Sequence, residues 1–545
     1  LSLPRKLLYA ALLSVVGVAV MLSGLELGLR LVGYGHSSHF FRAARAPGGE
    51  AIWRENRWAL APFFPGALIR RPQPIRLPGT KAPGTCRIFV LGSSAAMGDP
   101  EPSFSLARML EVMLRGTYPD GRFEVVNAAV TAINSHVVRD IAADCARLSP
   151  DVFIVYEGNN EVIGPFGPTG TLAPFLRRES AIRAAIWLKR TRTGQLLANL
   201  GKRDLPANWG GMEMFLKQRI AQDDPRLDAV RRNFRANLAA IAASAHQAGA
   251  ATLLCTVATN QRDFPPFLST NVEAEKMYRD GRAALQADRD DEARQLLQGA
   301  LDRDLLRFRT DSSLNQVIRD FDQAGLPGLT VVDVAGALAT RSAHGITGDE
   351  FLYEHVHLTL RGTYEAALAL WPRLTAELAR RKLLPEARPN ALSYEDTSLR
   401  LGSNIYEQTM IALELVNRLQ KPPFTEQSDH IARLTTWQRR AHTGQDLLGR
   451  TDATPALREI SRRALAFSPD DWRLARNTGA MLVSRQQAAE ALPLLERAAA
   501  WIDDDVDTLV ALGWAHKALG HAAESEAAFA KARALESNYP SLPKS

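Results

Sequence analysis

Ser94 stands at the end of a short apolar run and at the start of a small-residue turn. The run, residues 87–91, is bounded by Gly84 and Gly92, which predicts a buried strand of an α/β sheet. Apolar residues at helical spacing over 103–115 predict that a helix follows. A turn of this kind lifts a hydroxyl to the sheet edge, where amide groups can stabilise an anion. Ser94 is therefore a candidate nucleophile, although a serine here can also simply cap a turn.

A serine nucleophile needs a base, a group that orients the base, and donors for the developing oxyanion. Glu354 and His357 lie three residues apart just before the last predicted helix of the α/β region, so the carboxylate can hold the far nitrogen of the imidazole. Asn160, after the third predicted strand, can point its amide NH₂ at an oxyanion. The loop 127–132, after the second strand, supplies backbone N–H groups.

Each of these residues also has a plainer interpretation. Asn159 and Asn160 are common turn residues, and Glu354 could make only a surface contact. His355 and His357 could form two ligands of a metal site, but no further cluster of Asp, Cys or His lies near them in the sequence. We predict neither a metal nor another cofactor.

The elements that would position these residues alternate between strand and helix. The predicted strands are 87–91, 123–127, 152–157, 251–257 and 329–334, and the predicted helices are 103–115, 135–148, 227–248 and 362–381. This alternation predicts a doubly wound parallel sheet with its site at the carboxyl ends of the strands. Residues 164–224 interrupt the pattern and could form a lid or a wall for the substrate.

The composition is that of an ordinary globular protein, with 46% hydrophobic and 23% charged residues. The net charge of +7 is spread along the 545 residues without a basic stripe, so we predict no nucleic-acid partner. The cysteines, Cys86, Cys145 and Cys255, fit no zinc or disulfide spacing. Buried thiols are the simplest interpretation, with one disulfide left open in an oxidising compartment.

Residues 7–25 carry no charge and, as a helix about 28 Å long, could cross a bilayer. Arg5 and Lys6 precede this run, and no cleavage site or lipobox cysteine follows it closely. We expect an uncleaved signal anchor with its N-terminus in the cytoplasm and the remainder outside, although further arginines after the run blur the charge count. Residues 36–84 are expected to form a linker that ends in an edge strand near 67–76.

The C-terminal third is helical, and small or apolar residues in it recur at a spacing of 34. They are Ala464, Ala498 and Ala532; Gly479 and Gly513; and Leu495 and Phe529. This period is typical of tetratricopeptide repeats, which bind protein partners. The stretch 272–321 matches the pattern once, with Gly281, Ala293, Leu297 and Ala300. A single unit cannot bury its apolar face alone, so it should pack on the α/β domain or on the C-terminal helices.

Together, the four candidate segments resemble the sequence blocks of the SGNH hydrolases, also called GDSL-type esterases. The first block of that family is Gly-Asp-Ser, and here it is Gly92, Ser93 and Ser94, which places the nucleophile on Ser94. The glycine of the second block, a backbone oxyanion donor, falls on Ala132. Ala132 keeps the N–H group but adds a Cβ, which narrows the allowed backbone. Ser93 should change how the serine loop is supported rather than the chemistry.

The third and last blocks follow in the same order. The third, Gly-x-Asn-Asp, appears as Gly158, Asn159 and Asn160 followed by a glutamate, which places the side-chain oxyanion donor on Asn160. The last, Asp-x-x-His, places the base on His357 and its partner on Glu354, one methylene longer than aspartate. The resemblance covers residues 87–381 and is to a membrane-anchored subset with C-terminal tetratricopeptide repeats. It implies a flavodoxin-like hydrolase domain.

These patterns together divide the chain. We expect a signal-anchor transmembrane helix at 1–33, a linker and edge strand at 34–84, the hydrolase domain at 85–384 with the insertion 272–321, a helical connector at 385–450, and repeats at 451–545. The implied function is a serine esterase of the inner membrane whose domain faces the periplasm or exterior. Its substrate would be an acylated small molecule, lipid or glycan. Acyl transfer to an envelope glycan with the same residues and an inert scaffold that binds partners through the repeats remain alternatives.

Overall fold

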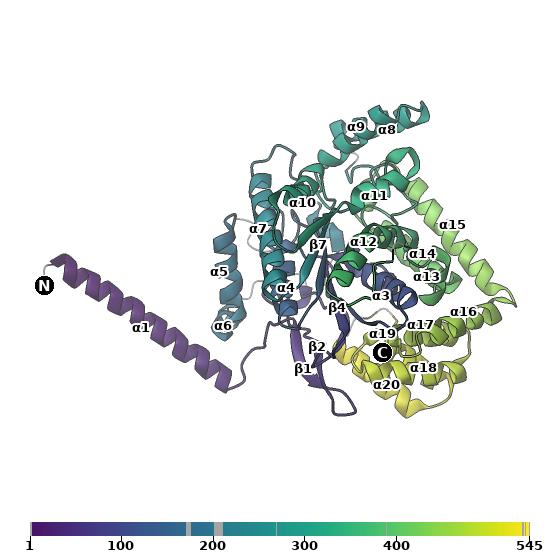
Figure 1. Ribbon diagram of the computed structural model, residues 1–545, viewed down its shortest axis with the longest axis horizontal. Coiled ribbons are helices and arrows are strands. Elements are labelled where there is room, and N and C mark those ends of the chain that lie inside the picture. The colour runs from purple at the N-terminus through teal and green to yellow at the C-terminus, as the bar shows by residue number, and fades with distance from the viewer. Residues whose placement is uncertain are drawn as a thin grey trace.

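The computed structural model describes residues 3–170, 176–200, 211–268, 270–388, 390–536, 539 and 541–543. A five-stranded parallel sheet lies at the centre (Figure 1). Its strands are β4 (Thr85–Gly92), β5 (Arg122–Asn127), β6 (Val152–Tyr156), β7 (Ala251–Cys255) and β8 (Leu329–Val332). Their order in the sheet is β5-β4-β6-β7-β8. Numbered from β4, this is the 2-1-3-4-5 order of flavodoxin-like folds, so the predicted parallel α/β sheet is confirmed.

Helices cover both faces of this sheet. On one face lie α3 (Leu106–Thr117), α11 (Val334–Arg341) and α12 (Leu360–Arg380); on the other lie α4 (Ser135–Ala146), α7 (Arg226–Gln247) and α10 (Ser312–Ala324). Every residue of β4, β6 and β7 is buried, as expected for central strands covered on both sides. Cys86, Cys145 and Cys255 are buried and free, as predicted for core thiols.

A second, antiparallel sheet precedes the first and corrects one prediction. It consists of β1 (Phe41–Arg45), β2 (Ala51–Glu55) and β3 (Arg76–Pro78), in that order. The edge strand expected at 67–76 is wrong: Gly66–Leu68 form a 3₁₀ turn, and β3 starts at Arg76 and pairs with β2. Pro72 and Pro74 interrupt the expected strand because proline has no N–H to donate to a ladder.

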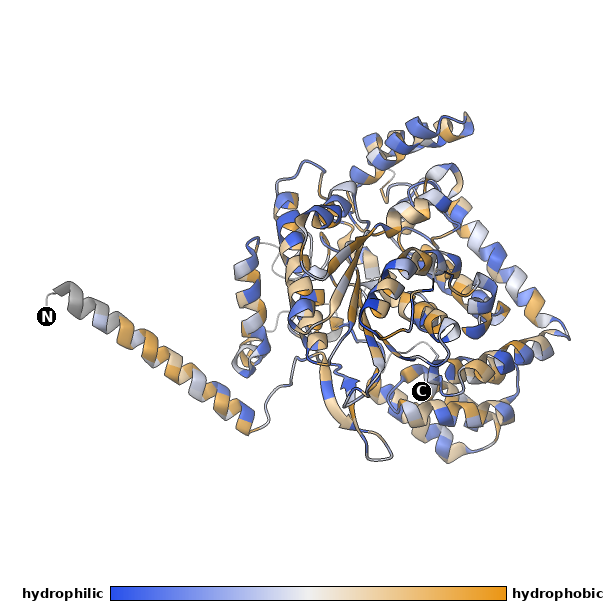
Figure 2. Ribbon diagram, viewed as in Figure 1, coloured by the Kyte–Doolittle hydropathy of each residue, from blue (hydrophilic) through white to orange (hydrophobic). Residues whose placement is uncertain are grey.

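The N-terminal helix α1 (Leu3–Leu31) projects from the body of the protein (Figure 1), and its apolar residues give it a long hydrophobic stretch in Figure 2. The segment Leu12–Leu31 has a mean hydropathy of 2.1 and none of it is buried. By length and composition this helix can cross a membrane. A signal sequence near the N-terminus can have the same length and composition.

Eight helices follow the α/β domain in the described part of the chain. They are α13 (Tyr394–Arg400), α14 (Ile405–Leu419), α15 (His430–Gly449), α16 (Ala453–Phe467), α17 (Trp472–Ser484), α18 (Ala488–Trp501), α19 (Val506–Ala518) and α20 (Ala522–Leu535). A Cβ at Gly479 would lie 2.5 Å from Leu495, and one at Gly513 would lie 2.5 Å from Phe529. The 34-residue spacing thus corresponds to a repeated close approach between paired helices.

The helix pair α8 (Val272–Gln286) and α9 (Asp290–Asp302) shows the same approach, because a Cβ at Gly281 would lie 2.8 Å from Leu297. Its apolar residues form one cluster with Ile346, which lies between α11 and α12. The inserted pair therefore covers its apolar face with the α/β domain, which is one of the two packings expected.

Side-chain contacts join the C-terminal helices to the α/β domain. Arg108 of α3 forms an ion pair with Asp471, at the start of α17. Arg473 donates to the carbonyl of Pro74 at 2.8 Å, and Asn477 donates to Ser103 Oγ at 3.1 Å. Helix α17 is thus fixed against the domain that carries Ser94.

Candidate active site

Ser94 begins the short helix α2 (Ser94–Met97), directly after the carboxyl end of β4. A Cβ at Gly92 would overlap the carbonyl oxygen of Tyr156 on the neighbouring strand, so glycine is required for this approach. Ser93 is the N-cap of α2 and is buried, whereas Ser94 lines a cavity. The two adjacent serines therefore differ in access: only Ser94 can meet a substrate.

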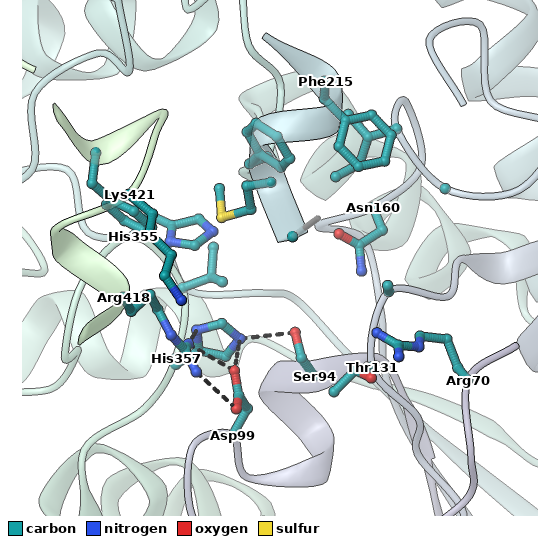
Figure 3. Close-up of a pocket in the computed structure, with 18 of the residues that line it drawn as sticks. Arg70, Ser94, Asp99, Thr131, Asn160, Phe215, His355, His357, Arg418 and Lys421 are labelled. Atoms are coloured by element: carbon teal, nitrogen blue, oxygen red, sulfur yellow. Dashed lines mark hydrogen bonds and ion pairs between the residues drawn. The ribbon is translucent and has the colours of Figure 1, made fainter. Parts of the chain in front are cut away.

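The imidazole of His357 lies between Ser94 and Glu354 (Figure 3). Its Nε2 is 2.8 Å from Ser94 Oγ, and its Nδ1 is hydrogen-bonded to the Glu354 carboxylate. The loop that carries both residues is closed by a bridge between Leu352 and Leu358. The structure thus brings together the predicted nucleophile, base and orienting carboxylate from segments 263 residues apart.

The Glu354 carboxylate is fully buried yet well stabilised as an anion. Burial alone would raise its pKa, but His355 and His357 outweigh that and hold the pKa of Glu354 well below its usual value. The backbone N–H groups of His355 and Val356 also donate to it, the second at 3.3 Å. A buried carboxylate with these partners can stabilise an imidazolium at His357.

His355 has a different environment from His357. Its ring packs among phenylalanines on several segments, namely Phe264, Phe267, Phe308 and Phe424. Burial lowers the pKa of His355. Its Nδ1 contacts Glu354, so His355 helps to hold the carboxylate and forms part of the cavity wall.

Two charged residues that the sequence analysis missed complete this side of the site. Asp99 Oδ2 lies 3.2 Å from His357 Nε2. Arg418, on α14, donates to both carboxylate oxygens of Asp99, at 2.8 and 3.1 Å. Burial would lower the pKa of His357, but Glu354 and Asp99 together raise it. The sequence offers only a turn signal at Asp99 and a regular helix around Arg418, neither of which indicates a site.

The predicted oxyanion donors line the same cavity on the side opposite His357. Asn160 Nδ2 donates to the carbonyl of Ile133 at 2.9 Å, and Figure 3 shows its amide nitrogen directed toward the side of the cavity where Ser94 lies. Ala132 lies in the left-handed region with φ +58°. An L-residue pays roughly 1–2 kcal/mol there, so this backbone position favours the glycine of the resembling family.

Hydrogen bonds between buried polar groups hold the loop after β6 in place. Asn159 Oδ1 accepts from the N–H of Thr310 at 3.1 Å and from its hydroxyl at 2.7 Å. Gly158 leaves room for this threonine, because a Cβ would lie 2.9 Å from Thr310 Oγ1. Glu161 accepts from Ser135 N and Oγ at 2.8 and 2.7 Å, and burial raises the pKa of Glu161 to about 7. Gly158 and Asn159 therefore support the loop that presents Asn160.

The cavity above Ser94 has a volume of about 380 Å³. Apolar side chains form much of its wall, including Phe64, Ile163, Met212, Phe215, Phe308 and Phe424. Arg70, Arg418 and Lys421 add positive charge, and the guanidinium of Arg70 points toward Ser94 and Thr131 in Figure 3. Parts of 164–224 line the cavity, as predicted for a wall. The connector after the α/β domain lines it as well, which was not foreseen.

A metal-ligand set is a second way to describe the buried trio. Glu354, His355 and His357 place three potential ligand atoms within 4.8 Å of one another. The carboxylate oxygens already accept from His357 Nδ1 and from two backbone N–H groups, while His357 Nε2 faces Ser94. The Glu354 oxygens and both ring nitrogens of His357 thus already have partners, so these atoms fit a hydrogen-bonded relay better than an ion site.

Comparison with known proteins gives little beyond this geometry. No protein-family model matches the chain, and no curated protein matches it. Among solved structures, the chain is weakly similar to the acetyl xylan esterase AlAXEase, with a TM-score of 0.27 and 12% identity. That similarity covers 53% of this chain and 99% of the esterase.

Proposed function

We propose that this protein is a serine esterase of the SGNH type that removes O-acyl groups from a substrate outside the cytoplasm. One observation carries the proposal: the His357 ring links Ser94 Oγ, at its Nε2, to the buried Glu354 carboxylate, at its Nδ1. A hydroxyl, an imidazole and a carboxylate in this order form the relay of serine hydrolases.

In the proposed reaction, Ser94 Oγ attacks the ester carbonyl while its proton passes to His357 Nε2. The N–H groups of Ser94 and Ala132 and the Asn160 amide hold the oxyanion. The tetrahedral intermediate collapses, His357 returns the proton to the leaving alcohol, and an acyl-enzyme forms. Water then attacks the acyl group with His357 as base, which releases the acid and restores Ser94. Glu354 keeps Nδ1–H in place throughout and stabilises each imidazolium.

Asp99 and Arg418 adjust this relay. The Asp99 carboxylate near Nε2 favours the imidazolium, and the Arg418 guanidinium limits that effect by neutralising Asp99. We assign both to positioning and charge balance at His357. Through Arg418, the helical connector at 385–450 becomes part of the proposed active site.

The location is part of the proposal. With Leu12–Leu31 long enough to span a bilayer and Arg5 and Lys6 before it, α1 would anchor the protein in the inner membrane with the α/β domain outside. The substrate would be an acylated lipid, glycan or small molecule. The helical repeats would bind a protein partner.

A fluorophosphonate probe tests the chemistry directly. The intact protein is labelled, digested with trypsin and sequenced by mass spectrometry, where the peptide 88–108 contains both Ser93 and Ser94. We expect the added mass on Ser94, none in Ser94→Ala, and matching loss of aryl-acetate hydrolysis in that variant. Folded protein that hydrolyses the ester but carries no label on Ser94 would overturn the proposal. Adding a sugar acceptor and measuring acylated sugar distinguishes transfer from hydrolysis.

A further inference from the structure

Helices α5 (Glu179–Arg190) and α6 (Arg192–Leu200) expose large apolar side chains that the core does not use. The inner face of α5 is buried through Ile182 and Ile186. Trp187 is 68% exposed, and on α6 Leu197 and Leu200 are 57% and 76% exposed. Large side chains gathered in this way on a short segment are a feature of surfaces that meet a membrane or another molecule.

Helix α6 is joined to the end of α1 and to the segment that follows it. The Glu26 carboxylate accepts from the backbone N–H of Arg192 at 3.0 Å and of Thr193 at 2.9 Å, at the first turn of α6. Gln195 exchanges hydrogen bonds with the backbone of His36, both at 3.0 Å. Figure 1 shows α5 and α6 on the side of the body from which α1 projects.

Trp187 lies near the level at which the apolar helix ends. A hollow of about 230 Å³ there is lined by Arg30 of α1, by residues 36–39, and by Trp187, Arg190 and Arg192. Tryptophan and arginine at the end of a spanning helix are characteristic of the membrane–water interface, where the ring meets the acyl boundary and the cation meets headgroups.

The charge of this segment is complementary to an anionic lipid surface. The six basic residues of 176–200 are Arg177, Arg178, Arg183, Lys189, Arg190 and Arg192, against the single acidic residue Glu179. Arg177, Arg178 and Arg183 are exposed. Exposed basic residues beside a spanning helix can contact anionic headgroups.

We propose that α5 and α6 lie on the lipid bilayer as an interfacial helix pair, with Trp187, Leu188, Leu197 and Leu200 in the boundary between headgroups and acyl chains. The inference rests on the proposed anchoring by α1. It adds a second attachment, which fixes how the α/β domain is oriented toward the membrane. Because Gly164 and Pro165 before this segment and Met212 and Phe215 after it line the catalytic cavity, the cavity wall is tied to the lipid surface. The geometry therefore favours a substrate that is held in the membrane or close to it.

Single engineered cysteines test this in the full chain in lipid nanodiscs. The native cysteines are all buried, so a thiol-reactive environment-sensitive dye will label an introduced cysteine selectively. The test sites are Trp187→Cys and Leu197→Cys. Ile431→Cys on α15, where the native side chain is 71% exposed, is the matched control away from α1, and Val16→Cys reports on the anchor. Each labelled protein is titrated with aqueous iodide and with lipids that carry a quencher.

We expect dyes at 187, 197 and 16 to shift to the blue and to be quenched by the lipid-borne quencher, and the dye at 431 to be quenched by iodide alone. Lipid quenching at 16 with iodide quenching at 187 and 197 would overturn the docking while the anchor stands. Iodide quenching at 16 would overturn the anchor and the docking together. Dyes at 187 and 197 shielded from both quenchers would show that protein, not lipid, covers the helices, which also overturns the proposal.

Discussion

Arg418 holds Asp99 with two nitrogens of its guanidinium, at 2.8 and 3.1 Å, although 319 residues separate them in the chain. Asp99 in turn lies 3.2 Å from His357 Nε2. The charge at the candidate base is therefore set partly by a helix outside the α/β domain. A protein truncated at residue 384 would therefore lack Arg418, one of the charged residues of the site.

Asp99 should shift the pH dependence of catalysis. Since Asp99 raises the pKa of His357 and the base must be neutral to work, Asp99→Asn should move the acidic limb of kcat/KM to lower pH. Arg418→Gln should move it the other way, because Arg418 lowers the pKa of His357. Full pH–rate profiles of both variants provide the check. Limbs that stay in place, or move in the same direction, would contradict the assigned charge balance.

Alanine substitutions at the two adjacent serines should differ sharply in their effect on activity. Ser94→Ala should abolish hydrolysis of a short-chain aryl ester, because it removes the only hydroxyl within 2.8 Å of His357 Nε2 among the described residues. Ser93→Ala should retain measurable activity, since Ser93 is buried as the N-cap of α2. Steady-state rates with thermal melts decide between them. An inactive but folded Ser93→Ala beside an active Ser94→Ala would shift the site by one residue.

The histidine pair gives a second contrast. His357→Ala should lower kcat by several powers of ten, since a positioned base supplies about 10²–10⁴-fold and the serine is unactivated without it. His355→Ala should cost far less, because that ring contacts Glu354 and phenylalanines, whereas the ring of His357 is hydrogen-bonded to Ser94. Glu354→Gln should fall between, as an amide can orient the ring but cannot stabilise the imidazolium. The order would be refuted by a His357→Ala enzyme within tenfold of the parent, measured on protein of matched fold.

Position 132 should accept glycine but not a β-branched residue. Relief of roughly 1–2 kcal/mol of left-handed strain exceeds the roughly 0.4–1 kcal/mol that glycine adds to the unfolded chain's entropy. Ala132→Gly should therefore raise the free energy of unfolding by up to about 1.6 kcal/mol and keep activity, whereas Ala132→Val should lower both. Urea unfolding followed by circular dichroism measures the difference. A destabilised glycine variant would mean that the positive φ is not held in solution.

Topology can be tested independently of catalysis. The short arm with Arg5 and Lys6 should remain in the cytoplasm, so everything after α1 should lie outside. An alkaline phosphatase fused after Pro47 should be active, and a cytoplasmic reporter at the same position should be silent. The reverse pattern would place the α/β domain in a reducing compartment and remove the envelope substrate from consideration.

Local signals were sufficient to predict the central sheet. All five strands lie where apolar runs predicted them. Ser94, directly after β4, meets Glu354 and His357, which lie on the loop before α12. The catalytic roles of these residues stay predictions. The edge strand expected at 67–76 is interrupted by Pro72 and Pro74, and β3 begins only at Arg76.

What the sequence could not show depends on distant contacts. No sequence pattern near Asp99 or Arg418 indicates a site residue, because the two residues come together only when α14 packs beside the carboxyl ends of the strands. The same holds for the cavity, whose wall combines Phe64, Met212 and Phe424 from three separate segments. Periodicity reports which face of an element is buried, but not which distant element buries it.

The contacts of α17 with the α/β domain affect how any protein bound to the helical repeats would meet Ser94. Arg108 with Asp471, Pro74 with Arg473, and Ser103 with Asn477 fasten the repeats at their side rather than leaving them on a free hinge. A bound partner would be presented at one distance and in one orientation. These helices would then fix the distance between a bound partner and Ser94, and only a substrate at the correct position along that partner would reach Ser94.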